Sequence, residues 1–199
     1  MTDMTLIDWH DGSWLNPPPS STITNGQMIV ESAEGSDFWR RTAYVFTRDS
    51  GHAFLIPFPL DSALEVTFRA DFDHLYDQAG ILIRVDERTW IKAGVEVTDG
   101  EPHVAAVATR EFSDWSLAPV PSWRGQLVTV RASRSGDAVT LRARTPDSPW
   151  RTIRLTPLAA DAIATAGPMC CSPQRGGLHV TFTRFATGPA DTDLHTQPD

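Results

Sequence analysis

Charged and aromatic side chains interrupt two apolar runs in LYDQAGILIRVDERTWIKAGVEV, residues 75–97. Successive side chains of a β-strand point to opposite faces, so Trp90, Lys92 and Glu96 share one face of the second run. Arg84 lies on the corresponding polar face of the first run. An aromatic ring can stack on the C–H face of a sugar while planar polar groups bind its hydroxyls. This face is therefore predicted to bind a carbohydrate or a similar polar metabolite.

Residues 39–47 are predicted to form a strand that presents Trp39 and Arg41 on the same side. Gly80 and Gly94 lie on the polar face and are expected to leave room for a ligand. The predicted ligand-binding residues are Trp39, Arg41, Gln78, Arg84, Trp90, Lys92 and Glu96. The alternative is structural, with both tryptophans covered by loops and Arg84 ion-paired with Glu96.

Acidic residues raise the possibility of glycoside hydrolysis, which uses two carboxyl groups about 5 to 9.5 Å apart. Glu96, Asp71 and Asp86 are weak candidates for this chemistry, because the E-x-D-x-x-E motif of sandwich glucanases is absent. The sequence also lacks Gly-x-Ser-x-Gly and phosphate-binding glycine motifs. The catalytic residues are therefore unassigned, and whether the protein is an enzyme stays open.

A second polar segment, TREFSDWS at 109–116, follows a predicted strand and precedes a proline-rich loop. Loops at strand ends carry function more often than the strands do. In the alternative, Phe112 and Trp115 hold the loop against the core. Both interpretations stay open from the sequence.

Composition excludes several other classes of function. The chain has 25 acidic and 17 basic residues and no run of Lys or Arg, so nucleic-acid binding is not expected. Cys170 and Cys171 are adjacent and the six His are dispersed, which predicts neither a disulfide framework nor a metal site. No cofactor motif is present. The N-terminus does not resemble a signal peptide and no apolar stretch could span a membrane, so a cytoplasmic location without membrane contact is expected.

The elements that must position these residues are almost all strands. About eleven runs with period-2 alternation are separated by turn residues at sandwich-like intervals. The predicted fold is all-β, a concanavalin A-like jelly-roll β-sandwich of two antiparallel sheets. Residues 1–186 are expected to form a single domain, and the polar residues 187–199 a C-terminal tail that is disordered or loosely attached.

Four blocks of the sequence resemble a bacterial and fungal family of unknown function. These blocks are SDFWRRTAYVFTRDSGH (36–52), LYDQAGILIRVDERTWIKAGVEVTDG (75–100), TREFSDWS (109–116) and GPMCCSPQRGGLHVTF (167–182). The family has the concanavalin A-like lectin/glucanase fold and includes the fungal regulation-of-enolase protein. The resemblance implies the jelly-roll fold but no particular chemistry. Cys171 stands where a small residue such as Ala is expected, which argues against a role for the cysteine pair.

The sequence thus leads to three functional hypotheses. The first is a jelly-roll domain that binds a carbohydrate, a sugar phosphate or a similar metabolite. The second is a glycoside hydrolase or lyase that uses Glu96 with Asp71 or Asp86. The third is a regulatory module of carbohydrate metabolism that contacts a metabolic enzyme through its surface.

Overall fold

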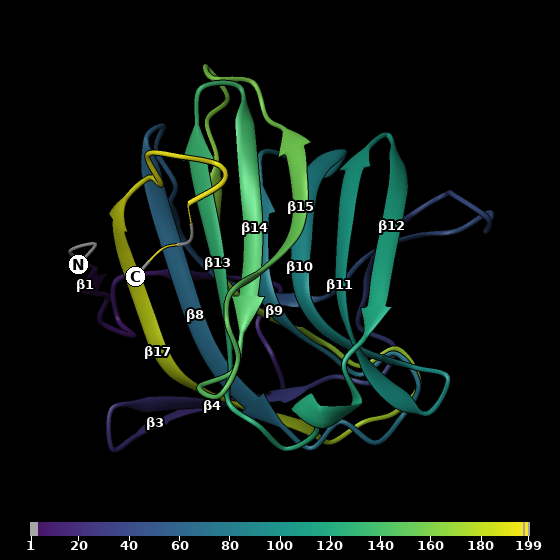
Figure 1. Ribbon diagram of the computed structural model, residues 1–199. Coiled ribbons are helices and arrows are strands. Elements are labelled where there is room, and N and C mark those ends of the chain that lie inside the picture. The colour runs from purple at the N-terminus through teal and green to yellow at the C-terminus, as the bar shows by residue number, and fades with distance from the viewer. Residues whose placement is uncertain (1–3, 197, 199) are drawn as a thin grey trace.

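Alternating apolar residues form long antiparallel strands that pack face to face in two sheets (Figure 1). The computed structural model describes residues 4–196 and 198. The first sheet contains, in spatial order, β15 (Arg151–Pro157), β14 (Ala138–Arg144), β13 (Val128–Ser135), β8 (Ser62–Ala70), β17 (Leu178–Pro189), β4 (Gln27–Ser32) and β3 (Ser20–Thr24), with β1 (Thr5–Leu6) paired to β17.

The second sheet contains, in order, β12 (Phe112–Pro119), β11 (Glu101–Arg110), β10 (Thr89–Thr98), β9 (Gln78–Arg84), β16 (Thr165–Cys171), β7 (His52–Pro57) and β2 (Ser13–Leu15). A separate hairpin is formed by β5 (Phe38–Arg40) and β6 (Thr47–Asp49), and Pro121–Trp123 form one 3-10 turn. The all-β jelly-roll prediction is confirmed. Within the described residues, no helix has the length and hydrophobicity needed to cross a membrane.

The main core lies between the two sheets, and its members follow the period-2 pattern. Ile81 and Ile83 of β9 and Val95 of β10 are among its buried residues. The opposite side chains of the same strands face away from this core. There Phe38 of the hairpin, Leu82, Trp90 and other apolar residues form a second, smaller cluster on the outer face of the second sheet. The hairpin is therefore packed on the outside of the sandwich.

The two cysteines divide between these clusters. Cys170 belongs to the main core and Cys171 to the smaller cluster, and both are buried free thiols. Burial raises the pKa of Cys170 to about 12, so this thiol stays protonated and unreactive at neutral pH.

The structure differs from the predicted strands in one region that matters for the site. Residues 39–47 do not form one strand, because the chain turns between β5 and β6. Arg41 and Ala43 in this turn have φ angles of 62° and 61°, which take the backbone out of the extended region. The segment TREFSDWS, by contrast, contributes to β12, the edge strand that follows β11.

The predicted domain boundary at residue 186 falls inside β17, which continues to Pro189. Beyond it, Asp191 forms ion pairs with Arg131 and Arg142 of the first sheet. Residues 197 and 199 of the predicted tail lie outside the described residues.

Candidate ligand-binding pocket

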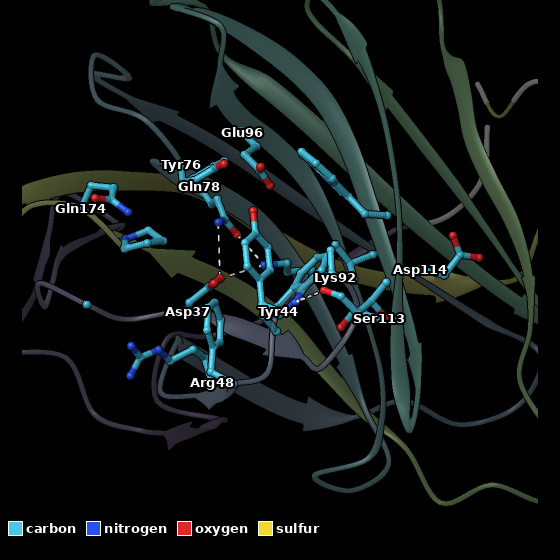
Figure 2. A pocket seen from close by; sticks show the side chains of 18 residues that line it. Asp37, Tyr44, Arg48, Tyr76, Gln78, Lys92, Glu96, Ser113, Asp114 and Gln174 are labelled. Carbon is cyan, nitrogen blue, oxygen red and sulfur yellow. Dashed lines mark hydrogen bonds and ion pairs between the residues drawn. The ribbon is translucent and has the colours of Figure 1, made fainter.

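A pocket of about 810 Å³ lies on the outer face of the second sheet, beside the β5–β6 hairpin (Figure 2). Its floor is formed by side chains of β9, β10 and β11, and its walls by the hairpin, β12 and two loops. The lining residues are Gly35, Asp37, Trp39, Thr42, Ala43, Tyr44, Phe46, Arg48, Tyr76, Gln78, Lys92, Glu96, Val107, Ser113, Asp114, Trp115, Pro173 and Gln174. Pockets of about 300 to 1,000 Å³ are the size that binds small molecules.

Three polar side chains form a hydrogen-bonded network on the floor. Lys92 Nζ donates to Asp37 Oδ1 at 3.0 Å and to Gln78 Oε1 at 2.8 Å. Gln78 Nε2 completes the triangle by donating to Asp37 Oδ1 at 3.4 Å. Burial acts to lower the pKa of Lys92, but the negative charge of Asp37 raises it above its ordinary value. Lys92 is therefore a charged ammonium whose three N–H groups have only two acceptors in this network.

Glu96 is the other acid of the floor, and its surroundings are different. It is only 6% exposed, yet within the described residues its carboxyl group makes no hydrogen bond or ion pair within 4.0 Å. Burial raises the pKa of Glu96 from 4.5 to about 7, although the charge of Lys92 acts in the opposite direction. The carboxyl group of Glu96 lines the pocket and is therefore available to bind a polar group of a ligand.

Two tyrosine hydroxyls point toward Glu96. Figure 2 shows Tyr44 and Tyr76 directed toward its carboxyl group, Tyr44 from the turn of the hairpin and Tyr76 from the loop before β9. Burial raises the pKa of Tyr76, and the neighbouring Tyr44 hydroxyl adds to the shift. The Tyr76 hydroxyl is therefore protonated at neutral pH, and the hydroxyls of Tyr76 and Tyr44 can both donate hydrogen bonds into the pocket.

Aromatic rings form the wall above this floor. The ring centroid of Trp39 lies 6.0 Å from that of Tyr44 and 6.3 Å from that of Trp115, both in edge-to-face geometry. Tyr44 in turn stacks on Phe46 at 5.1 Å. These rings are partly exposed, so their faces are available to a ligand that enters the pocket.

Four of the seven predicted ligand-binding residues line the pocket, namely Trp39, Gln78, Lys92 and Glu96. The other three lie elsewhere. Trp90 is 2% exposed and packs beneath Phe38, with a centroid distance of 5.9 Å, so it presents no face for stacking. Arg84 donates to both carboxylate oxygens of Asp49, at 2.7 and 2.8 Å. Arg41 points outward and lies over the Phe112 ring at 5.8 Å.

The three weak catalytic candidates, Glu96, Asp71 and Asp86, lie in different parts of the structure. Asp86 accepts hydrogen bonds from the backbone N–H groups of Arg88 and Thr89, so it closes the β9–β10 turn. Hydrogen bonding by the Arg88 backbone lowers the pKa of Asp86, which holds it as a carboxylate. Asp71 is exposed just after β8 and does not line the pocket. Glu96 is thus the sole one of the three in the pocket, where it is accompanied by Asp37.

The site also contains Asp37, Tyr44 and Tyr76, which were not among the predicted ligand-binding residues. Asp37 and Lys92 are 55 residues apart, and no local periodicity connects them. Tyr44 is displaced from its predicted place by the turn at Arg41, and Tyr76 has a φ angle of 64° that no sequence signal indicates. Trp115 and Asp114 do lie in the segment TREFSDWS, which was identified as a candidate for function or for anchoring.

The residues Asp73, His74 and Asp77 are the group within the described chain whose ligand atoms are close enough to hold a metal ion. Their geometry has a simpler explanation. Arg175 Nη2 lies 2.7 Å from Asp77 Oδ2 and 2.9 Å from Asp73 Oδ1. The guanidinium therefore supplies the positive charge that the two carboxylates need.

Comparison with known proteins identifies a family. Residues 14–190 match the model described as "Protein of unknown function (DUF1349)". "Regulation of enolase protein 1" of Saccharomyces cerevisiae is 37% identical over 196 residues, which cover 98% of each chain. A crystal structure described as a functionally unknown protein from the same yeast has a TM-score of 0.87 at 34% identity, covering 93% of this chain and 100% of that one.

A more distant likeness extends to glycoside hydrolase structures. The structure of the Bacteroides ovatus xyloglucan PUL GH43B has a TM-score of 0.73 at 11% identity and covers 95% of this chain and 40% of that one. At this identity the likeness concerns the jelly-roll fold alone.

Proposed function

The chain belongs to the DUF1349 family, and from the chemistry of its pocket we propose that it binds a carbohydrate or a similar polyhydroxyl metabolite. The observation that carries this proposal is the pairing of Glu96, whose side chain lines the pocket floor, with the aromatic wall above it. A sugar ring offers a hydroxyl to the carboxyl group and a C–H face to the rings of Trp39, Tyr44 and Trp115.

The charges of the pocket favour a neutral ligand over a sugar phosphate. Lys92 is balanced by Asp37 at 3.0 Å, and Asp114 at the rim is ion-paired with Arg154. Arg48, the other cation of the lining, lies over the Phe46 ring at 5.2 Å. A phosphate is normally bound by several converging donors with net positive charge, which this arrangement does not provide.

Calorimetric titration of the purified protein tests the proposal. The panel contains neutral mono- and oligosaccharides together with sugar phosphates, and we expect binding of a neutral member. Tyr44→Ala/Trp115→Ala should weaken that binding at least ten-fold. Val45→Ala is the matched control, because Val45 lies in the same turn but outside the lining. Absence of binding across the panel, or an unaffected double variant, would contradict the proposal.

The pKa of Glu96 favours a second candidate function, namely a glycoside hydrolase or lyase. A carboxyl group that titrates at about 7 is suited to exchange a proton with a substrate at neutral pH. Asp37 would supply the second carboxylate. Release of a chromogenic aglycone from aryl glycosides tests the hydrolase, and absorbance of an unsaturated product tests the lyase. Glu96→Gln should abolish turnover and retain binding, whereas turnover that survives in Glu96→Gln would exclude this role.

Regulation through a protein partner is supported by the apolar tip of the hairpin. Val45 is fully exposed, and Tyr44 and Phe46 beside it are 50% and 41% exposed. A relative of this chain carries the name "Regulation of enolase protein 1", so a metabolic enzyme such as enolase is the partner to test. Interferometry with purified enolase should detect binding that Val45→Asp removes. Lack of binding by the unmodified protein would count against this role.

A further inference from the structure

The β5–β6 hairpin crosses the outer face of the second sheet and is held at both sides. On one side the backbone N–H of Arg40 donates to Ser113 Oγ of β12 at 2.9 Å. On the other side, Ser172 directly after β16 donates its backbone N–H to Ser36 Oγ at 2.9 Å. In the sheet, β11, β10 and β9 lie between β12 and β16. The segment from Ser36 to Asp49 therefore spans the strands that form the pocket floor.

The hairpin is also held along its length. The carboxylate of Asp49 accepts from both terminal guanidinium nitrogens of Arg84, and its carbonyl accepts from Asn16 Nδ2 at 2.8 Å. Phe38 is completely buried in the apolar cluster beneath the hairpin. These contacts make the hairpin a fixed wall at one end of the floor.

The opposite end of the floor is also closed. Tyr76 stands there, and its backbone N–H donates to the Val97 carbonyl of β10 at 2.7 Å. Figure 2 shows the side chains of Tyr44 and Tyr76 directed toward the carboxyl group of Glu96. Trp115 of the edge strand β12 and the pair Pro173–Gln174 after β16 form the remaining sides. The pocket is therefore lined from four directions, by the hairpin, the Tyr76 loop, β12 and the segment after β16.

Building on the proposed carbohydrate binding, we infer that the pocket recognises the end of a glycan chain or a free saccharide of a few units, and not an internal stretch of a polymer. An internal unit is linked at both ends and would need two exits, which the hairpin and the Tyr76 loop obstruct. A terminal unit also has a free hydroxyl where an internal unit has a glycosidic bond. The spare N–H of Lys92 and the carboxyl group of Glu96 can bind such a hydroxyl.

Recognition of a chain end is tested with oligosaccharides of different lengths whose ends are free or blocked. Cello-, xylo- and malto-oligosaccharides of two to six units, and the matching polymers, are titrated into the protein by calorimetry. For a series that binds, we expect the affinity per chain to stop increasing after a few units. Blocking one particular end, by reduction of the reducing end or by methylation of the non-reducing end, should weaken binding at least ten-fold. The number of protein molecules bound by a polymer should not exceed its number of chain ends.

Different results separate this inference from the proposal on which it rests. Oligosaccharides that bind equally well with both ends blocked, or a polymer that binds many protein molecules per chain, would overturn recognition of an end while leaving carbohydrate binding intact. Failure of every free oligosaccharide in all three series would overturn both. Binding of the short chains with free ends distinguishes the two outcomes, because it tests carbohydrate binding without testing recognition of an end.

A hairpin variant tests the wall directly. Replacement of residues 41–46 by Asn-Gly joins β5 to β6 through a short turn and removes Tyr44 and Phe46. Loss of Tyr44 should weaken binding of all oligosaccharides, but we expect this variant to discriminate less than the wild type between free and end-blocked chains. Tyr44→Ala/Phe46→Ala retains the backbone of the turn and serves if the shorter hairpin fails to fold, and Val45→Ala is the control. A folded variant that discriminates between free and end-blocked chains as strongly as the wild type would count against the inference.

Discussion

At the scale of single residues, two acids on one pocket floor differ because Asp37 is hydrogen-bonded to the Lys92 ammonium, whereas Glu96 interacts with that charge only at longer range. Asp37 accepts from Lys92 at 3.0 Å, whereas Glu96 makes no hydrogen bond within the described residues. Period-2 alternation correctly predicted that Gln78, Lys92 and Glu96 share a face. The alternation could not predict Asp37. This residue directly precedes β5, and the β5–β6 hairpin reaches the sheet through tertiary contacts of side chains such as Phe38.

Glu96 should make the stability of the protein depend on pH. Its pKa is about 7 in the folded protein and near 4.5 when exposed, so between these values the folded state binds the extra proton. Stability should therefore fall as the pH rises from 4.5 to 7, by on the order of 3 kcal/mol. Urea unfolding should show this decrease in the wild type relative to Glu96→Gln. Glu87→Gln, at an exposed position, is the control and should not change the slope.

Lys92 should be essential for the stability of the floor. It is 4% exposed and is the sole lysine of the sequence. Lys92→Met leaves the carboxylate of Asp37 without its cation, which for a buried pair costs about 3 to 5 kcal/mol. The urea midpoint should fall accordingly, and Lys92→Met/Asp37→Asn should recover part of the loss. A single variant as stable as the wild type would show that water replaces the ammonium.

At the scale of elements, strands β9 and β10 approach each other closely at a pair of glycines. Gly80 and Gly94 are directly opposite in the register, and a Cβ on Gly94 would lie 2.0 Å from the carbonyl oxygen of Ala79. The expectation that these glycines make room for a ligand is therefore not supported, since neither belongs to the lining of the pocket. Their role is to allow backbone contact between two strands of the floor.

Substitution of either glycine should destabilise the sheet. In Gly94→Ala the methyl group must displace the backbone of β9, an overpacking cost of about 1 to 3 kcal/mol or more. Thermal unfolding should show a clear loss of stability. Gly176→Ala is the matched control, because its Cβ would have no neighbour closer than 3.9 Å. Equal effects of the two substitutions would exclude close strand approach as the cause.

The elements also show where sequence patterns stop being informative. In long alternating segments such as 63–72, the predicted strand lies close to the observed one, because one face of the strand must be buried in the sandwich. In residues 39–47 the same type of pattern led to a wrong strand. No glycine or proline marks the turn there, although Arg41 and Ala43 have positive φ angles. The Arg41 N–H donates to the Phe46 carbonyl at 3.0 Å across the turn, and the hairpin is bound to β12 at Arg40 and to β9 at Asp49.

At the scale of the whole molecule, both outer faces of the sandwich carry buried charges, but they are covered differently. On the second sheet the hairpin leaves a pocket above Lys92 and Glu96. On the first sheet, the completely buried Arg131 is bound by Glu65 at 2.9 Å and by Asp191 at 2.7 Å. Asp191 follows β17, so the segment after the last strand closes this face (Figure 1). Residues that composition assigns to a polar tail thus take part in an ion-pair network.

Asp191 should therefore contribute to global stability although it lies near the C-terminus. Its carboxylate bonds to the buried guanidinium groups of Arg131 and Arg142, and its backbone N–H donates to Ser133 Oγ at 2.8 Å. Asp191→Asn leaves two buried cations with less compensation, at a cost of about 3 to 5 kcal/mol. Because a buried pair is screened little by salt, this loss should persist in urea unfolding at high ionic strength.

The neighbouring Asp193 provides the control for this prediction. It is exposed and bonds only to His195 and Thr196 within the described residues. Asp193→Asn should leave the urea midpoint unchanged. Truncation after Ala190 should cost at least as much as Asp191→Asn, since it removes the carboxylate bound by Arg131 and Arg142 and also the Leu194 carbonyl that accepts from Arg142 Nη2 at 2.7 Å. If truncation were harmless, solvent would have to satisfy these guanidinium groups, and the segment after β17 would be a loosely attached tail.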